Sequence, residues 1–133
     1  MALIGGGGAG NVGGGSAAGS STNFQTLGNS LYAYSGGITS NDSSLTSIFQ
    51  DRSPQDASYL LKCYVDIGSN AGYTIYLDLN GVRVGNFFVN GDEAYPSTSP
   101  FELIVPNDTD VNIQVLSVSG TPTHYVRIIG EQL

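Results

Sequence analysis

The chain has 133 residues, a formal net charge of −7 and 11% charged side chains, well below the roughly 25% of typical soluble domains. Its length suits one domain with a single core. Its four basic residues are too few for the cationic footprint of a nucleic-acid-binding protein, and its single cysteine excludes an internal disulfide framework. Much of the surface must therefore consist of uncharged polar groups and tyrosine, as on proteins that pack against neighbours.

The chain begins with an uncharged, glycine-rich segment, residues 1–22, in which Met1, Leu3 and Ile4 form a small apolar tip. Glycine loses the most backbone freedom on ordering and has no side chain to bury, so this segment cannot build a core of its own. We interpret it as an extended arm that becomes ordered on a partner protein. The domain itself is expected over residues 23–133.

The arm also contains the dinucleotide-binding pattern Gly5-x-Gly7-x-x-Gly10. That pattern binds a pyrophosphate only where a strand precedes it and a helix follows it, and neither is expected here. A secretory signal is not expected, because the apolar run stops at Ile4 and carries no positive residue. No run approaches the about 18 apolar residues of a membrane-spanning helix, so we expect no contact with a membrane.

After the arm, apolar and polar residues alternate with a period of two, which is typical of strands with one buried face. The clearest unit is a hairpin, because Asn80-Gly81 is the preferred pair for a type I′ turn. Strands are predicted at eight places: 31–39, 45–49, 59–67, 73–79, 82–89, 101–105, 111–118 and 125–130. With polar turns and no helical segment, this pattern predicts an all-β fold, an eight-stranded antiparallel β-sandwich with the jelly roll as the leading topology. An immunoglobulin-like sandwich is the alternative, although its Cys-Trp-Cys spacing is absent.

The inward positions of these strands should supply the core. Cys63 falls on the inward face of its strand, where a free cysteine behaves as a small buried hydrophobe. The predicted core residues are Leu61, Cys63, Val65, Ile75, Leu77, Leu79, Phe101, Leu103, Val105, Val111, Ile113, Val115, Val126 and Ile128.

Candidates for catalysis or metal binding are few. His124 is the only histidine, and we interpret it as a surface or rim residue because it stands beside Pro122 at the entrance of a strand. No pattern ties a serine or carboxylate to it for catalysis. Asp108-Thr109-Asp110 and Asp92-Glu93 lack the ordered ligand spacing of a calcium loop. We therefore expect no enzymatic activity, no catalytic residue, no metal site and no cofactor.

Tyrosines on outward strand positions are the more informative polar residues. Tyr32 and Tyr34 share one face of an uncharged strand, while Tyr64 and Tyr76 point outward from theirs. Tyrosine combines apolar area with a hydroxyl and is enriched in protein interfaces; it also stacks on sugars. We take Tyr32, Tyr34, Tyr64 and Tyr76 as candidate subunit-interface residues, the alternative being half-buried sheet residues without such a role.

Three segments carry a resemblance to a known group of proteins: residues 1–11 (MALIGGGGAGN), 29–36 (NSLYAYSG) and 101–106 (FELIVP). They resemble small structural proteins of tailed bacteriophages, particularly head decoration or cement proteins. The resemblance implies a compact β-sandwich, often a homotrimer, on the outside of the capsid, assembled in the host cytoplasm. It also implies an arm that reaches across neighbouring major capsid subunits. The capsid-binding arm residues would then be Met1, Ala2, Leu3, Ile4, Gly5, Gly6, Gly7, Gly8, Ala9, Gly10, Asn11 and Val12.

Two alternatives remain open. One is a tail-fibre or receptor-binding tip domain, in which the outward tyrosines contact host glycans. The other is a carbohydrate-binding module or a carbohydrate-active enzyme, of which the enzyme would need a close pair of carboxylates. No spacing in the sequence identifies such a pair.

Overall fold

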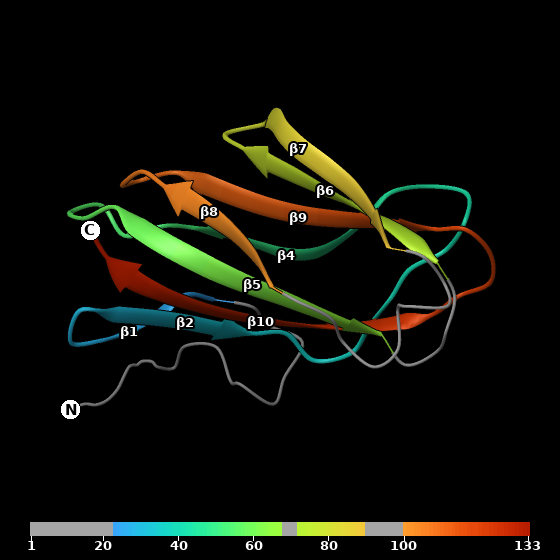
Figure 1. Ribbon diagram of the computed structural model, residues 1–133, viewed down its shortest axis with the longest axis horizontal. Helices are drawn as coiled ribbons and strands as arrows, with labels where there is room; N and C mark the ends of the chain where they lie inside the picture. Colours follow the sequence, from blue (N-terminus) through green and yellow to red (C-terminus); the bar gives the residue numbers. More distant parts are fainter. Residues whose placement is uncertain (1–22, 68–71, 90–99) are drawn as a thin grey trace.

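The computed structural model describes residues 23–67, 72–89 and 100–133 (Figure 1). The predicted arm and the pair Asp92-Glu93 lie outside these described residues. Within the described ranges the secondary structure consists of ten strands, and every pairing between them is antiparallel. The strands are β1 (Gln25–Leu27), β2 (Ser30–Tyr34), β3 (Ile38–Thr39), β4 (Thr46–Arg52), β5 (Tyr59–Ile67), β6 (Tyr73–Leu79), β7 (Val82–Val89), β8 (Phe101–Val105), β9 (Asp110–Ser117) and β10 (Thr123–Gln132).

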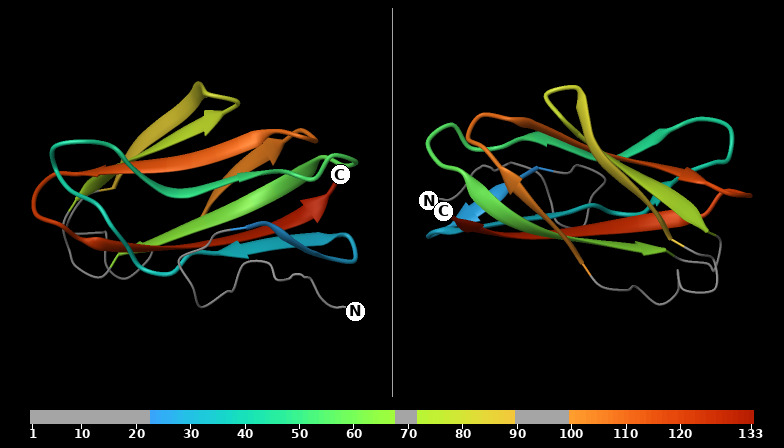
Figure 2. Two further views of the ribbon diagram at one scale, coloured as in Figure 1. Left: turned by 180° about the vertical axis from the view of Figure 1, so that it is seen from behind. Right: turned by 45° about the horizontal axis from the view of Figure 1, so that its top comes forward.

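The strands form two sheets that pack face to face (Figures 1 and 2). One is six-stranded with the order β1-β2-β10-β5-β8, with β3 also paired to β10; the other is four-stranded with the order β4-β9-β6-β7. The predicted all-β sandwich is therefore confirmed. Apart from the short β1 and β3, each sheet contains four strands, and their order is of the jelly-roll type.

The predicted hairpin is also confirmed. Asn80 and Gly81 have φ values of 52° and 78°, as a type I′ turn requires of both central residues. β6 and β7 pair on either side of this turn, with one irregularity in register next to Leu77.

The prediction of one strand over residues 31–39 was wrong. The structure has two strands there, β2 and β3, which both pair with β10. Between them the Ser35 N–H donates to the Val126 carbonyl oxygen at 2.9 Å, and the Ser35 hydroxyl accepts from the Val126 N–H at 2.9 Å. Because a side-chain oxygen takes the place of a backbone carbonyl, the regular ladder is interrupted at this residue. β1 was not predicted at all.

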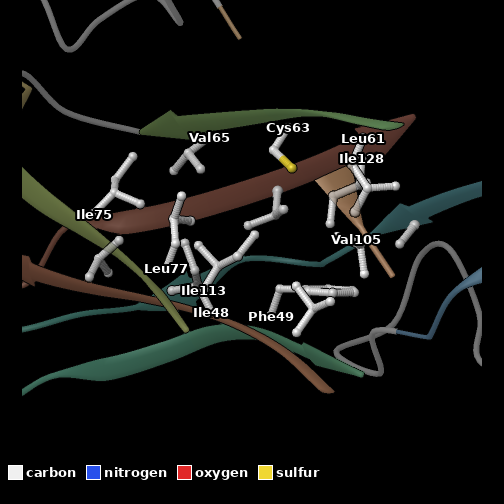
Figure 3. Close-up of a cluster of buried hydrophobic side chains, with 14 of the residues drawn as sticks. Ile48, Phe49, Leu61, Cys63, Val65, Ile75, Leu77, Val105, Ile113 and Ile128 are labelled. Atoms are coloured by element: carbon white, nitrogen blue, oxygen red, sulfur yellow. The ribbon is translucent and has the colours of Figure 1, made fainter. Parts of the chain in front are cut away.

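The core lies between the two sheets, where side chains from both point toward one another (Figure 3). Leu79, Phe101 and Leu103, which were predicted as core residues, are only partly buried and pack against the core. Phe101 and Leu103 belong to the edge strand β8, and Leu79 is the last residue of β6 before the hairpin turn. The other predicted core residues are buried. The core also contains Leu31, Ala33, Ile48, Phe49, Tyr59, Ile67 and Tyr73.

Cys63 has no exposed surface, and its burial raises the pKa of the thiol to about 12. A thiol that stays protonated is a poor nucleophile. The structure thus confirms the interpretation of Cys63 as a small apolar core residue.

Candidate interaction surface on the six-stranded sheet

The outward side of the six-stranded sheet carries most of the predicted interface tyrosines. On β2 the burial alternates, so that Leu31 and Ala33 lie in the core and Tyr32 and Tyr34 point outward. The rings of Tyr32 and Tyr34 lie 5.7 Å apart and are tilted by 47°. The prediction that this pair shares one face of its strand is therefore confirmed, and that face is the outward one.

Strand register brings Tyr64 to the same face. Arg127 on β10 lies opposite Tyr34 on β2 and opposite Tyr64 on β5, so the three residues form one row across three strands. The Arg127 guanidinium carbon is 4.4 Å from the centre of the Tyr64 ring, a cation–π contact. Its Nε is 3.7 Å from Asp66 Oδ2.

Two further residues of this face were missed by the sequence analysis. Tyr125 and Ile129 flank Arg127 on β10, and their exposed fractions are 44% and 45%. Since Val126 and Ile128 were predicted to point inward, the alternation of β10 already indicated that Tyr125 and Ile129 point outward. Together these residues form the tyrosine face: Tyr32, Tyr34, Tyr64, Tyr125, Arg127 and Ile129.

The outward side of the six-stranded sheet, which carries the tyrosine face, is nearly neutral although the chain is acidic. The charged outward residues of the six-stranded sheet are Lys62, Asp66, Glu102, Arg127 and Glu131. Two basic and three acidic side chains give this side a net charge of −1, compared with −7 for the whole chain. A broad surface of aromatic rings with little net charge is suited to contact with another protein.

The structure does not place Tyr76 with the other three candidate interface residues. Tyr76 belongs to β6 and points outward from the four-stranded sheet, on the opposite side of the sandwich. There the Arg83 guanidinium carbon is 4.5 Å from its ring centre, and Arg83 Nε donates to Asp78 Oδ1 at 2.6 Å. Tyr76 therefore cannot share one flat contact surface with Tyr32, Tyr34 and Tyr64.

Phe24, just before β1 of the six-stranded sheet, is held by β4 of the four-stranded sheet. The Phe24 N–H donates to Asp51 Oδ2 at 2.7 Å, and the Phe24 ring packs edge-on against Phe49 with ring centres 5.0 Å apart. Both contacts lie on β4, so Phe24 is fixed to the sandwich. β1 follows directly and forms the edge of the six-stranded sheet next to β2.

The interpretation of His124 as a surface residue was wrong, because it has no exposed surface. It occupies an inward position of β10, two residues before Val126. Its Nε2 lies 2.8 Å from the Ser40 hydroxyl oxygen, and its ring packs edge-on against Tyr73 at 4.9 Å. Burial lowers the pKa of His124 to about 4, so the imidazole is neutral at physiological pH.

Asp108 and Asp110, the candidate calcium ligands of the sequence, bind side chains of β4. The Asp108 Oδ1 atom lies 3.4 Å from Arg52 Nη1, and Asp110 Oδ2 accepts from Gln50 Nε2 at 3.1 Å. In the described part of the chain, no group of three or more histidine, cysteine or carboxylate side chains is placed to hold a metal ion. Nor do the described residues include a helix of the length and hydropathy needed to cross a membrane.

Comparison with known proteins finds similar solved structures but no related family or curated protein. No protein-family model matches the chain, and no curated protein matches its sequence. One similar solved structure is the insecticidal delta-endotoxin Cry8Ea1 of Bacillus thuringiensis, at TM-score 0.49 and 16% identity over 74% of this chain. This chain spans only 20% of the toxin's length.

Two other similar structures are spore and carbohydrate-binding proteins. The first is a protein of Bacillus endospore appendages, which form disulfide-linked pili, at TM-score 0.48 and 14% identity over 84% of this chain and 90% of that protein. The second is the C-terminal CBM6 domain of the laminarinase LamC of Zobellia galactanivorans, at TM-score 0.35 and 18% identity over 75% of this chain and 73% of that domain.

Proposed function

We propose that this chain is a non-enzymatic structural protein of a bacteriophage head, a decoration protein that binds the outside of the shell. In this proposal the N-terminal arm bridges major capsid subunits, and the sandwich forms an exposed knob. The observation that carries the proposal is the tyrosine face, an aromatic and nearly neutral surface on an acidic protein. The uncharged arm precedes β1, which is the edge strand of that same sheet.

The two parts have complementary roles in the proposal. The tyrosine face supplies the rigid contact, because its rings project from paired strands and Arg127 connects β10 to β5. Tyrosine and arginine are among the residues enriched at the hot spots of protein interfaces. If the face joins copies into a homotrimer, each arm after the first binds the shell at a high effective concentration. Many weak arm contacts then add up to stable decoration.

The burial of the reactive side chains supports a non-enzymatic role. His124 and Cys63 are the chain's only histidine and only cysteine, and both have no exposed surface. They would be the first candidates for a general base and a nucleophile. In the core neither can reach a substrate, and each has a packing role instead.

The geometry of the rings favours a protein partner over a glycan. A sugar stacks its C–H-rich face on an open aromatic ring face, but Tyr32 and Tyr34 are tilted by 47° to one another and Arg127 lies over one face of the Tyr64 ring. A tail-fibre tip that binds host glycans is therefore the second candidate, with the exposed tyrosines as its support.

Deletion of residues 2–22 tests the proposal. The truncated chain should unfold at nearly the same temperature as the full chain, because Phe24 and the core are retained, and it should lose binding to purified phage shells. Decoration of shells at full occupancy by the truncated chain would contradict the role of the arm. Binding to a glycan array that disappears in Tyr34→Ala would favour the second candidate.

A further inference from the structure

β7 forms an outer edge of the four-stranded sheet. Among the described residues it pairs with β6 alone, and it lies at the margin of the sandwich (Figures 1 and 2). From Gly85 to Val89 its pairing with β6 is regular, and the shift in register comes before Gly85. One side of this stretch therefore presents a row of backbone N–H and C=O groups to which no strand of the described chain is paired.

The stretch from Gly85 to Val89 lacks the devices that protect an edge. It reads Gly-Asn-Phe-Phe-Val, without a charge or a proline, and Phe88 is 58% exposed. Proteins normally blunt their edge strands with charges, prolines or short length. The nearest charge, Arg83, lies before the shift in register and is bound to Asp78 on β6.

The other three edges of the sandwich are protected. β1 has only three residues. β4 includes Asp51 and Arg52, and β8 has Glu102 in its five residues and is followed by Pro106. The contrast singles out β7 as the edge that can accept a further strand.

We infer that β7 pairs in antiparallel fashion with β7 of a second copy of this chain, over residues 85–89. A two-fold axis at Phe87 sets Gly85 opposite Val89 and Asn86 opposite Phe88 of the other copy. No charged residue lies in the paired stretch, so two acidic molecules can approach there without opposed like charges. The two four-stranded sheets become one continuous sheet across the axis.

A second copy fits this edge better than the glycine-rich arm does. Valine and phenylalanine favour strands, whereas glycine disfavours them and loses more entropy on ordering. The pairing is independent of the proposed role on a phage head, because it uses the sheet opposite the tyrosine face.

Sedimentation of the full chain over a range of concentrations tests the inference. We expect a monomer–dimer equilibrium that Phe88→Lys weakens by at least about tenfold in dissociation constant, because lysine on an edge strand opposes pairing. The matched control is Val118→Lys, whose side chain is 61% exposed against 58% for Phe88 and lies outside the strands. It should leave the dissociation constant unchanged, and equal melting temperatures would show that both variants fold.

Hydrogen exchange gives a second readout that needs no variant. The amides of residues 85–89 that point away from β6 should exchange more slowly as the protein concentration rises. A chain that is monomeric at all concentrations would overturn the inference. So would an association that persists in Phe88→Lys and is lost in Tyr34→Lys, because that result assigns it to the tyrosine face.

Discussion

The two outer faces of the sandwich differ in the chemistry of their outward side chains. On the four-stranded sheet, polar side chains bind one another: the Ser47 hydroxyl donates to Asn112 Oδ1 at 2.6 Å, and Arg83 binds both Asp78 and Gln114. On the six-stranded sheet, aromatic and aliphatic side chains such as Tyr34, Tyr125 and Ile129 remain substantially exposed. Among the described strands of the first face, large exposed apolar side chains lie only on β7, such as Phe88 at 58%, whereas on the second face they extend to the inner strand β10.

The largest expected effect concerns the core that both faces share. Ile128 projects from the six-stranded sheet and Ile113 from the four-stranded sheet, and neither has exposed surface. Ile128→Ala and Ile113→Ala should each lower the free energy of unfolding by about 2–5 kcal/mol, through lost burial and an unfilled cavity. Urea denaturation measures both. A much smaller loss for one of them would show that the two sheets do not contribute equally to the core.

Acid should destabilise the sandwich through His124, which projects from β10 into the core and packs against Tyr73 on β6 of the other sheet. Its folded pKa of about 4 lies below the ordinary 6.5, so the unfolded chain takes up a proton first as the pH falls. Stability should therefore be lost between pH 6.5 and 4, by up to about 3 kcal/mol, with no further loss from this group below pH 4.

His124→Gln is the control for the acid effect. The amide of glutamine can still hydrogen-bond to Ser40 but does not titrate in this range. The variant should lose this part of the pH dependence of unfolding, whatever its stability at neutral pH. An unchanged slope between pH 6.5 and 4 would assign the acid sensitivity to the carboxylates.

Alanine substitution of matched tyrosines separates the two faces by function. Tyr34→Ala and Tyr64→Ala should weaken binding to the shell or between subunits by about thirtyfold, the size of an interface hot spot. Tyr76→Ala, on the opposite side of the sandwich, should leave binding unchanged. Equilibrium binding of the folded variants measures this difference. Equal losses for all three would contradict the assignment of the contact surface to the tyrosine face.

The smallest effects are expected at the two hairpin turns, one in each sheet. Gly28 and Gly81 have φ values of 61° and 78°, and a Cβ at either would meet nothing within 4 Å. Alanine there should cost about 1 kcal/mol of unfolding free energy, from backbone conformation alone. We expect the loss to be larger at Gly81, since β6 and β7 are long and β1 has three residues. Thermal unfolding of Gly28→Ala and Gly81→Ala measures both losses. A larger loss for Gly28→Ala would show that β1 contributes more to stability than β6 and β7.

Local patterns predicted most of the fold. The bounds of β5, β6, β7 and β8 agree with the predicted strands, because alternation and turn residues define both ends of each. The division of residues 31–39 was not predictable, since it depends on the Ser35 hydroxyl meeting the Val126 N–H from 91 residues away. β1 was missed because three residues are too few to show a period.

Only part of the candidate site could be predicted from the sequence. Alternation predicts that Tyr64 and Tyr76 point outward, but it does not predict which sheet each strand joins. That depends on β10 pairing with both β2 and β5, which are contacts between distant parts of the chain. His124 shows a similar limit: it precedes the predicted strand 125–130 and was therefore assigned to the surface, whereas β10 begins at Thr123 and places His124 on its inward side.

The central position of β10 has a consequence for how the protein is made. β10 lies between β2 and β5 in the six-stranded sheet, yet it follows every other strand in the chain. Until the ribosome has released residues 123–132, β2 and β5 have no strand between them, and each exposes an unpaired edge. This half of the sandwich must therefore close after the rest of the domain has been synthesised, and a chain that stops before Thr123 would leave the facing edges of β2 and β5 unpaired.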